Sequence, residues 1–172
     1  MRFIDVLERI NVLIGRSVSW LTLVMVLVTF LIVVMRYVFG IGWIWLQESV
    51  TWMHAAVFML AAAYTLTREE HVRVDIFYSG LSNKFKAAID LFGSVIWLIP
   101  FSILVIWASK NFVLSAFSIG ETSPDPGGLP ARYILKACIP LAFFLLVLQG
   151  ISTAFSSIIT LFDEKKQLES KF

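Results

Sequence analysis

The sequence predicts an all-α membrane protein with four transmembrane helices, and three observations lead to this fold class. Of the 172 residues, 59% are hydrophobic and only 15% are charged, whereas a soluble domain carries about 25% charged residues. The mean hydropathy is +0.85, and a single soluble domain of this size would leave about 30% of its chain surface in water. The charged residues also divide the chain into four uncharged runs, each long enough to cross a hydrocarbon core of about 30 Å.

The same composition excludes several other classes of protein. A formal net charge of +2 is too small for a nucleic-acid-binding protein, and the high hydrophobic content excludes a disordered chain. The single cysteine, Cys138, cannot form an internal disulfide or a multi-cysteine metal cluster.

Residues 1–14 are expected to form a short amphipathic helix at the membrane interface. Charged residues occupy one side of this segment, and apolar residues occupy the other. The apolar side holds Phe3, Val6, Leu7, Ile10 and Ile14. Such a two-sided pattern is typical of a helix that lies in the headgroup region.

Four transmembrane spans follow this segment. The uncharged runs cover 17–35, 49–67, 91–109 and 137–162. We place the spans near 17–35, 49–67, 87–109 and 137–162, so that residues 1–172 form a single transmembrane domain. The first run is longer than the roughly 7–15 residues of a signal-peptide core and no cleavage site precedes Arg36, so we expect it to be retained.

Lysine and arginine predict the orientation of the chain. The N-terminal segment, the second loop and the C-terminal tail carry 10 of them, and the first and third loops carry 4. Positively charged segments near membrane spans stay in the cytoplasm. Both termini are therefore expected to be cytoplasmic.

The sequence gives little support for chemistry within the chain itself. Ion or proton pathways normally need charged residues inside the membrane, and the four long runs contain none. His54 and His71 are 17 residues apart, which is about 25 Å along a helix and too far for one haem. We expect no catalytic, cofactor-binding or metal-binding residues.

The second span carries two faces that suit helix packing. Polar side chains at Thr51 and His54 share one face, and the small residues Ser49, Ala56 and Ala63 recur every seven positions on another. Small residues let helices approach closely, and polar groups in lipid seek partners on other helices. Packing within this chain and docking to another membrane subunit explain these faces equally well.

Two pairs of charged or titratable residues flank the second span. Arg36 closes the first span and Glu48 opens the second at the same level, so we expect an ion pair between them; the other interpretation is two solvated charges at the headgroup level. His71 and Asp75 are four residues apart and could form a hydrogen bond if the helix continues. A solvated cytoplasmic turn is the other interpretation of that pair.

Several of these residues together resemble the small membrane subunit of tripartite ATP-independent periplasmic (TRAP) transporters, the DctQ-like family. The shared pattern is an arginine that ends helix one, a Trp and Glu that open helix two, and an H-x-x-V-D stretch after it. The matching residues are Arg36, Trp45, Glu48, Trp52, His71 and Asp75.

The resemblance implies a non-catalytic small permease subunit in the bacterial inner membrane. It would scaffold the large multi-span permease subunit of a sodium-driven organic acid importer, to which a periplasmic substrate-binding protein delivers the carboxylate. Its partners would be these two proteins and the lipid bilayer, without nucleic acid or cofactor. Two alternatives are a small self-contained homo-oligomeric transporter, with Glu48 as the nearest candidate for an essential charge, and a membrane enzyme or redox subunit.

Overall fold

The computed structural model describes residues 2–68 and 80–169, and their regular structure is helical throughout. The helices in chain order are α1 (Arg2–Val38), α2 (Ile44–Leu60), α3 (Ala62–Thr67), α5 (Asn83–Phe92), the π-helical segment η1 (Gly93–Leu98), α6 (Ile99–Ser118) and α7 (Arg132–Glu169). Four stretches are long and apolar enough to cross a membrane, namely Ile4–Val38, Ile44–Thr67, Asn83–Ser118 and Arg132–Phe162. The predicted all-α fold with four such helices is confirmed.

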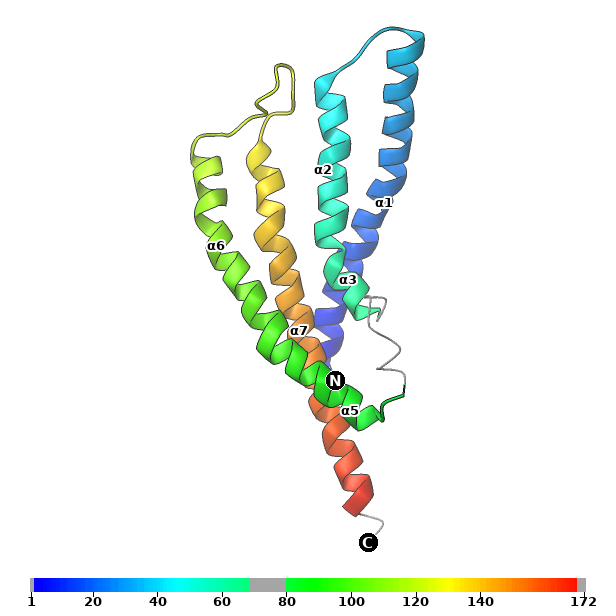
Figure 1. The fold of residues 1–172 in the computed structure, drawn as a ribbon, viewed down its shortest axis with the longest axis vertical. Coiled ribbons are helices and arrows are strands. Elements are labelled where there is room, and N and C mark those ends of the chain that lie inside the picture. Colours follow the sequence, from blue (N-terminus) through cyan, green and yellow to red (C-terminus); the bar gives the residue numbers. More distant parts are fainter. Residues whose placement is uncertain (1, 69–79, 170–172) are drawn as a thin grey trace.

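The long helices lie side by side in an open layer (Figure 1). Helix α6 packs against α7, α7 against α2, and α2 against α1. Near the end that carries both chain termini, α1 crosses to contact α3 and α7 as well. The accessible surface of 11860 Å² exceeds the roughly 8,500 Å² expected for a compact protein of this mass, so most apolar side chains remain available to lipid or to a partner.

Helix α1 runs from Arg2 to Val38 without a break at residue 14, the predicted end of the interfacial helix 1–14. On the predicted apolar side, Leu7 is buried while Val6 and Ile10 are exposed, and the polar Asn11 is buried as well. Contact with α7 therefore covers only part of the predicted apolar side. The location of residues 1–14 at the membrane interface stays a prediction.

Gly15 allows α1 to cross α3 at close range. A Cβ atom at this position would lie 2.3 Å from the Cβ of Tyr64, well inside a van der Waals contact. Glycine at a helix crossing lets two backbones approach in this way. Because of this crossing, the first part of α1 packs against α3 and α7.

A π-helical turn, η1, joins α5 to α6 within the third long helix. Pro100, at the start of α6, lacks a backbone N–H, and its ring crowds the carbonyl group four residues earlier. That carbonyl belongs to Ile96, inside η1. The wider π turn accommodates the proline, so Asn83–Ser118 continues as one long helical stretch.

Candidate functional site

The loop between α6 and α7, residues 119–131, folds over the start of α2. Glu48 accepts a hydrogen bond from the backbone N–H of Leu129 at 2.6 Å, and a second one from the hydroxyl of Ser123. Arg132, the first residue of α7, lines the same small cavity of about 140 Å³. Hydrogen bonds to a charged carboxylate are stronger than neutral ones, so Glu48 fastens the α6–α7 loop to α2.

Two glycines allow the loop to reach the carboxylate. Gly127 has a φ angle of +81°, a left-handed conformation that favours glycine, and its carbonyl accepts a hydrogen bond from the N–H of Trp45 at 3.2 Å. A Cβ atom on Gly128 would lie 2.7 Å from Oε2 of Glu48. Both positions therefore need glycine for the loop to close over α2.

The predicted ion pair between Arg36 and Glu48 is wrong. Arg36 is exposed at the end of α1, and no ion pair among the described residues joins it to Glu48. The donors to Glu48 come instead from positions 75 and 81 residues further along the chain. The hydrogen bonds to the Glu48 carboxylate therefore come from the folded loop and not from the nearby arginine.

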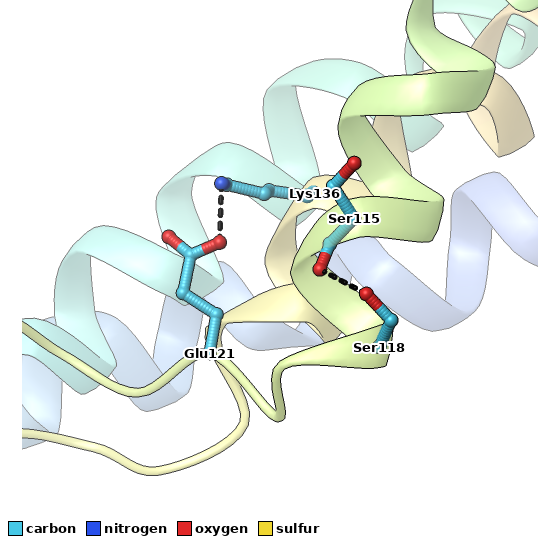
Figure 2. Close-up of polar contacts among 4 residues, drawn as sticks. All are labelled: Ser115, Ser118, Glu121 and Lys136. Carbon is cyan, nitrogen blue, oxygen red and sulfur yellow. Dashed lines mark hydrogen bonds and ion pairs between the residues drawn. The ribbon is translucent and has the colours of Figure 1, made fainter.

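A second charged contact fastens the same loop to α7. Nζ of Lys136 lies 2.5 Å from Oε2 of Glu121. Figure 2 shows this ion pair beside the last turn of α6, where the Ser118 hydroxyl donates to the Ser115 carbonyl. The Lys136 ammonium also lies 3.9 Å from the ring centroid of Phe112, within the range of a cation–π interaction. The loop is thus held at α2 and at α7.

Near the chain termini, a polar cluster joins α1, α3 and α7. Nδ2 of Asn11 donates to Oε1 of Gln149 at 2.9 Å, and the hydroxyl of Thr67 donates to the same oxygen at 2.8 Å. Ser152 donates to a carboxylate oxygen of Glu8 at 3.0 Å. Asn11, Gln149 and Ser152 are at most 3% exposed. We call these five residues the Gln149 cluster.

Sequence reasoning missed the Gln149 cluster. Asn11 lies in the segment predicted to be interfacial, and Gln149 lies in the fourth uncharged run. The available signal was the residue type, because a primary amide without a hydrogen-bond partner is costly in an apolar environment. A glutamine in the middle of an apolar run predicts a polar partner on another helix.

Polar side chains also line a surface groove of about 500 Å³ between α1 and α2. Thr22, Thr29, Thr51 and His54 lie in this groove and are exposed. Their side chains form no hydrogen bond with any other residue that the structure describes. We call these four residues the groove polar residues.

The small residues predicted to form a packing seam on α2 and α3 lie in different environments. Ala63 is buried, at 1% exposed, whereas Ser49 and Ala56 are half-buried. The Ser49 hydroxyl donates to the carbonyl of Leu46, one turn earlier, at 2.6 Å. Only the end of this seam near Ala63 is enclosed by the chain itself.

The remaining motif residues also lie in different environments. Trp52 is half-buried and lines the cavity around Glu48, while Trp45 is 45% exposed. His71 and Asp75 lie outside the described residues. Within the described ranges, no group of three or more His, Cys, Asp or Glu side chains could hold a metal ion. The predicted site residues that the structure describes therefore either join helices to one another or lie on the surface of the chain.

Comparison with known protein families gives one match over most of the chain. The family described as "Tripartite ATP-independent periplasmic transporters, DctQ component" matches residues 25–160. This range includes Glu48, the α6–α7 loop and Gln149. Among curated proteins, none matches this chain.

Proposed function

Because the chain belongs to the DctQ family of tripartite ATP-independent periplasmic transporter components, we propose that it scaffolds the large multi-span permease subunit of a sodium-driven organic acid importer. As a DctQ component, it is a multi-pass membrane protein and a non-enzymatic transport subunit. Sodium coupling, a carboxylate substrate and delivery by a periplasmic substrate-binding protein belong to the proposal. They rest on the motif residues between Arg36 and Asp75.

The groove between α1 and α2 is the observation that carries the proposal. Thr51 and His54 project polar groups from an apolar helix without a hydrogen-bond partner among the described residues. Polar groups at membrane depth seek partners on other helices, and each such bond is worth about 0.6–2 kcal/mol. A helix of the large permease subunit would supply these partners, and the open layer leaves the groove accessible to it.

A scaffold must also keep its own shape while its partner moves. The Glu48 site joins α2 to the α6–α7 loop at one end of the layer, and the Gln149 cluster joins α1 and α3 to α7 at the other. Both attachments connect the first two long helices to the last two. They support a rigid subunit against which the transport domain of the large subunit moves.

The distribution of charge favours this role over a self-contained transporter. Glu48 is the nearest candidate for an essential charge, and the α6–α7 loop already engages it through Leu129 and Ser123. No Asp or Glu lies in residues 17–35, 49–67, 91–109 or 137–162, so the middle of each predicted span offers no carboxylate for an ion path. The ion and substrate sites would therefore belong to the large subunit.

We also propose that both termini are cytoplasmic. The proposal rests on the 10 to 4 distribution of lysine and arginine between the two sides. It would place the Glu48 site on the periplasmic side and the Gln149 cluster near the cytoplasm. A periplasm-active reporter fused to the C-terminus should be inactive, and an active fusion would overturn this orientation.

Photocrosslinking within the intact complex tests the scaffold role. A photoreactive amino acid at Thr51 should form an adduct with the large permease subunit, because Thr51 lies in the groove. The matched control is Ala108, an exposed residue of α6 outside every groove described here. It should form adducts much more weakly.

The possible results test the scaffold role and the choice of the α1–α2 groove as contact surface separately. Copurification with the large subunit and equal adducts at both positions would overturn the groove as the contact surface and retain the scaffold role. Purification of this chain alone, together with sodium-dependent flux in liposomes that contain it alone, would overturn the scaffold role itself.

A further inference from the structure

The loop between α1 and α2, residues 39–43, carries exposed aromatic side chains at the end of the layer opposite the chain termini (Figure 1). Phe39 is 62% exposed and Trp43 is 40% exposed, and Tyr37, in the last turn of α1, is 82% exposed. None of the five loop residues is charged. Because exposed apolar surface is costly in water, these side chains favour an apolar or amphipathic environment.

The α1–α2 loop has a defined shape. The N–H of Ile41 donates a hydrogen bond to the carbonyl of Met35 at 3.0 Å, which folds the chain back toward the end of α1. Gly40 has a φ angle of +69°, in the left-handed region that favours glycine. The rings of Trp43 and Trp45 lie beside each other, with their centroids 6.4 Å apart. An ordered turn therefore presents the aromatic rings.

The α6–α7 loop, residues 119–131, lies at the same end of the layer and differs in chemistry (Figure 1). It contains the acidic residues Glu121 and Asp125 and the hydroxyl groups of Thr122 and Ser123. In residues 39–43, the indole of Trp43 is the only side chain that can form a hydrogen bond. The two loops therefore suit different surroundings, although they lie at the same end of the molecule.

The helices on either side of the α1–α2 loop determine where it lies. Both Ile4–Val38 and Ile44–Thr67 are long and apolar enough to cross a membrane. The loop between them spans at most about 18 Å when fully extended, so it stays at the membrane surface. Amphipathic aromatic rings favour the headgroup level of a bilayer. We propose that loop 39–43 inserts its aromatic side chains into the headgroup region, whereas loop 119–131 remains in water.

The surface of α1 that leads to this loop faces away from the α1–α2 groove. Leu31 and Val38 follow the groove residues Thr22 and Thr29 by nine positions each, which is two and a half helical turns. They therefore lie on the opposite side of α1, and both are exposed. A partner in the groove would leave this side and the adjoining loop in contact with lipid. The inference concerns only this chain and the bilayer, so it does not depend on the proposed transport role.

Spin labelling of the full-length chain in phosphatidylcholine nanodiscs tests the proposal. Cys138→Ser removes the one native thiol, and a nitroxide is then attached at Ile41→Cys, Asp125→Cys or Leu27→Cys, all exposed positions. Oxygen concentrates in hydrocarbon and a neutral nickel chelate concentrates in water, so the ratio of their collision rates with the nitroxide measures depth. The ratio at position 41 should be severalfold higher than at position 125 and lower than at position 27, which lies within the first span.

Two double variants test whether the aromatic rings hold the loop in the bilayer. Trp43 is the N-cap of α2, and its side chain forms no cap hydrogen bond. Serine is a favoured N-cap residue, so Trp43→Ser retains the start of the helix. Together with Phe39→Ser, it should lower the collision ratio in this loop toward that of the α6–α7 loop. The control, Trp97→Ser with Trp107→Ser, removes two exposed rings from the third long helix and should leave the ratio unchanged. Circular dichroism should show native helix content in both variants.

Three results would overturn the proposal. Equal ratios at positions 41 and 125 would place both loops in water. Low collision rates with both reagents at position 41, in nanodiscs that hold this chain alone or with the large permease subunit, would show that protein covers the loop. Equal ratios in the two double variants would show that the aromatic rings of the loop do not hold it in the bilayer.

Discussion

The Gln149 cluster and the groove polar residues are alike in chemistry and opposite in environment. Both consist mainly of uncharged polar side chains within apolar helices. The side chains of Asn11 and Gln149 are buried and hydrogen-bonded to each other, whereas the side chains of Thr51 and His54 are exposed and form no hydrogen bond with the residues that the structure describes. The difference separates polar residues that hold this chain together from those available to a second chain.

The largest expected effect comes from removing the centre of the cluster. Gln149→Leu should lower the free energy of unfolding by about 1–3 kcal/mol, because it leaves the buried Asn11 amide without its side-chain acceptor and removes the bond from the half-buried Thr67 hydroxyl. Denaturation of the purified protein in mixed micelles, followed by circular dichroism, would measure the change.

Gln47→Leu is the matched control for that variant. Gln47 is exposed near the start of α2, so the same substitution should change stability by less than about 0.5 kcal/mol. Equal effects of the two substitutions would show that the Gln149 cluster contributes no specific stability.

The groove should respond in the opposite way. The double substitution of Thr51 and His54 by leucine should leave the stability of the isolated chain nearly unchanged. It should weaken association with the large permease subunit by at least about sevenfold, because two interhelical hydrogen bonds of at least about 0.6 kcal/mol each are lost. Copurification yield and a subunit-exchange assay would measure this.

Phe58→Leu provides the reference for the groove. Phe58 is 75% exposed on the same helix but lies outside the α1–α2 groove. A comparable loss of association in this variant would assign the effect to general lipid exposure of α2 and not to the groove.

The smallest expected effect is local and concerns Glu48, whose bonds lie at the end of the layer. Glu48→Gln retains the shape of the side chain but weakens its bond to the N–H of Leu129. Hydrogen exchange at this amide should accelerate severalfold while the helices remain protected. Asp125→Asn, a change at an exposed acidic residue in the same loop, should leave the exchange rate unaltered.

The four membrane-crossing helices could be predicted from the sequence because charge is excluded from long apolar runs. This rule acts locally, so positions such as Arg16 and Arg36 indicate roughly where a span begins and ends. The family could also be predicted, since its motif is a short ordered pattern of residues. Both predictions depend on information that is close together in the chain.

The contacts of the candidate site could not be predicted in this way. Asn11 and Gln149 are 138 residues apart, and Glu48 and Leu129 are 81 apart. Which of these residues meet depends on the crossing of α1 at Gly15 and on the path of the α6–α7 loop. The sequence showed that Glu48 needs a partner, but the nearby Arg36 was the wrong choice.

The π turn η1 has a consequence for the spacing of small residues along the third long helix. The buried residues there are Ala87, Ser94, Ser102, Ser109 and Ala116. Their separations are seven, eight, seven and seven residues, and the longer interval contains most of η1 together with Pro100. A π turn takes up one residue more than an α turn, so the heptad row of small side chains continues in phase against α7. The chain therefore carries one extra residue in the middle of a span without rotating either end away from its neighbour.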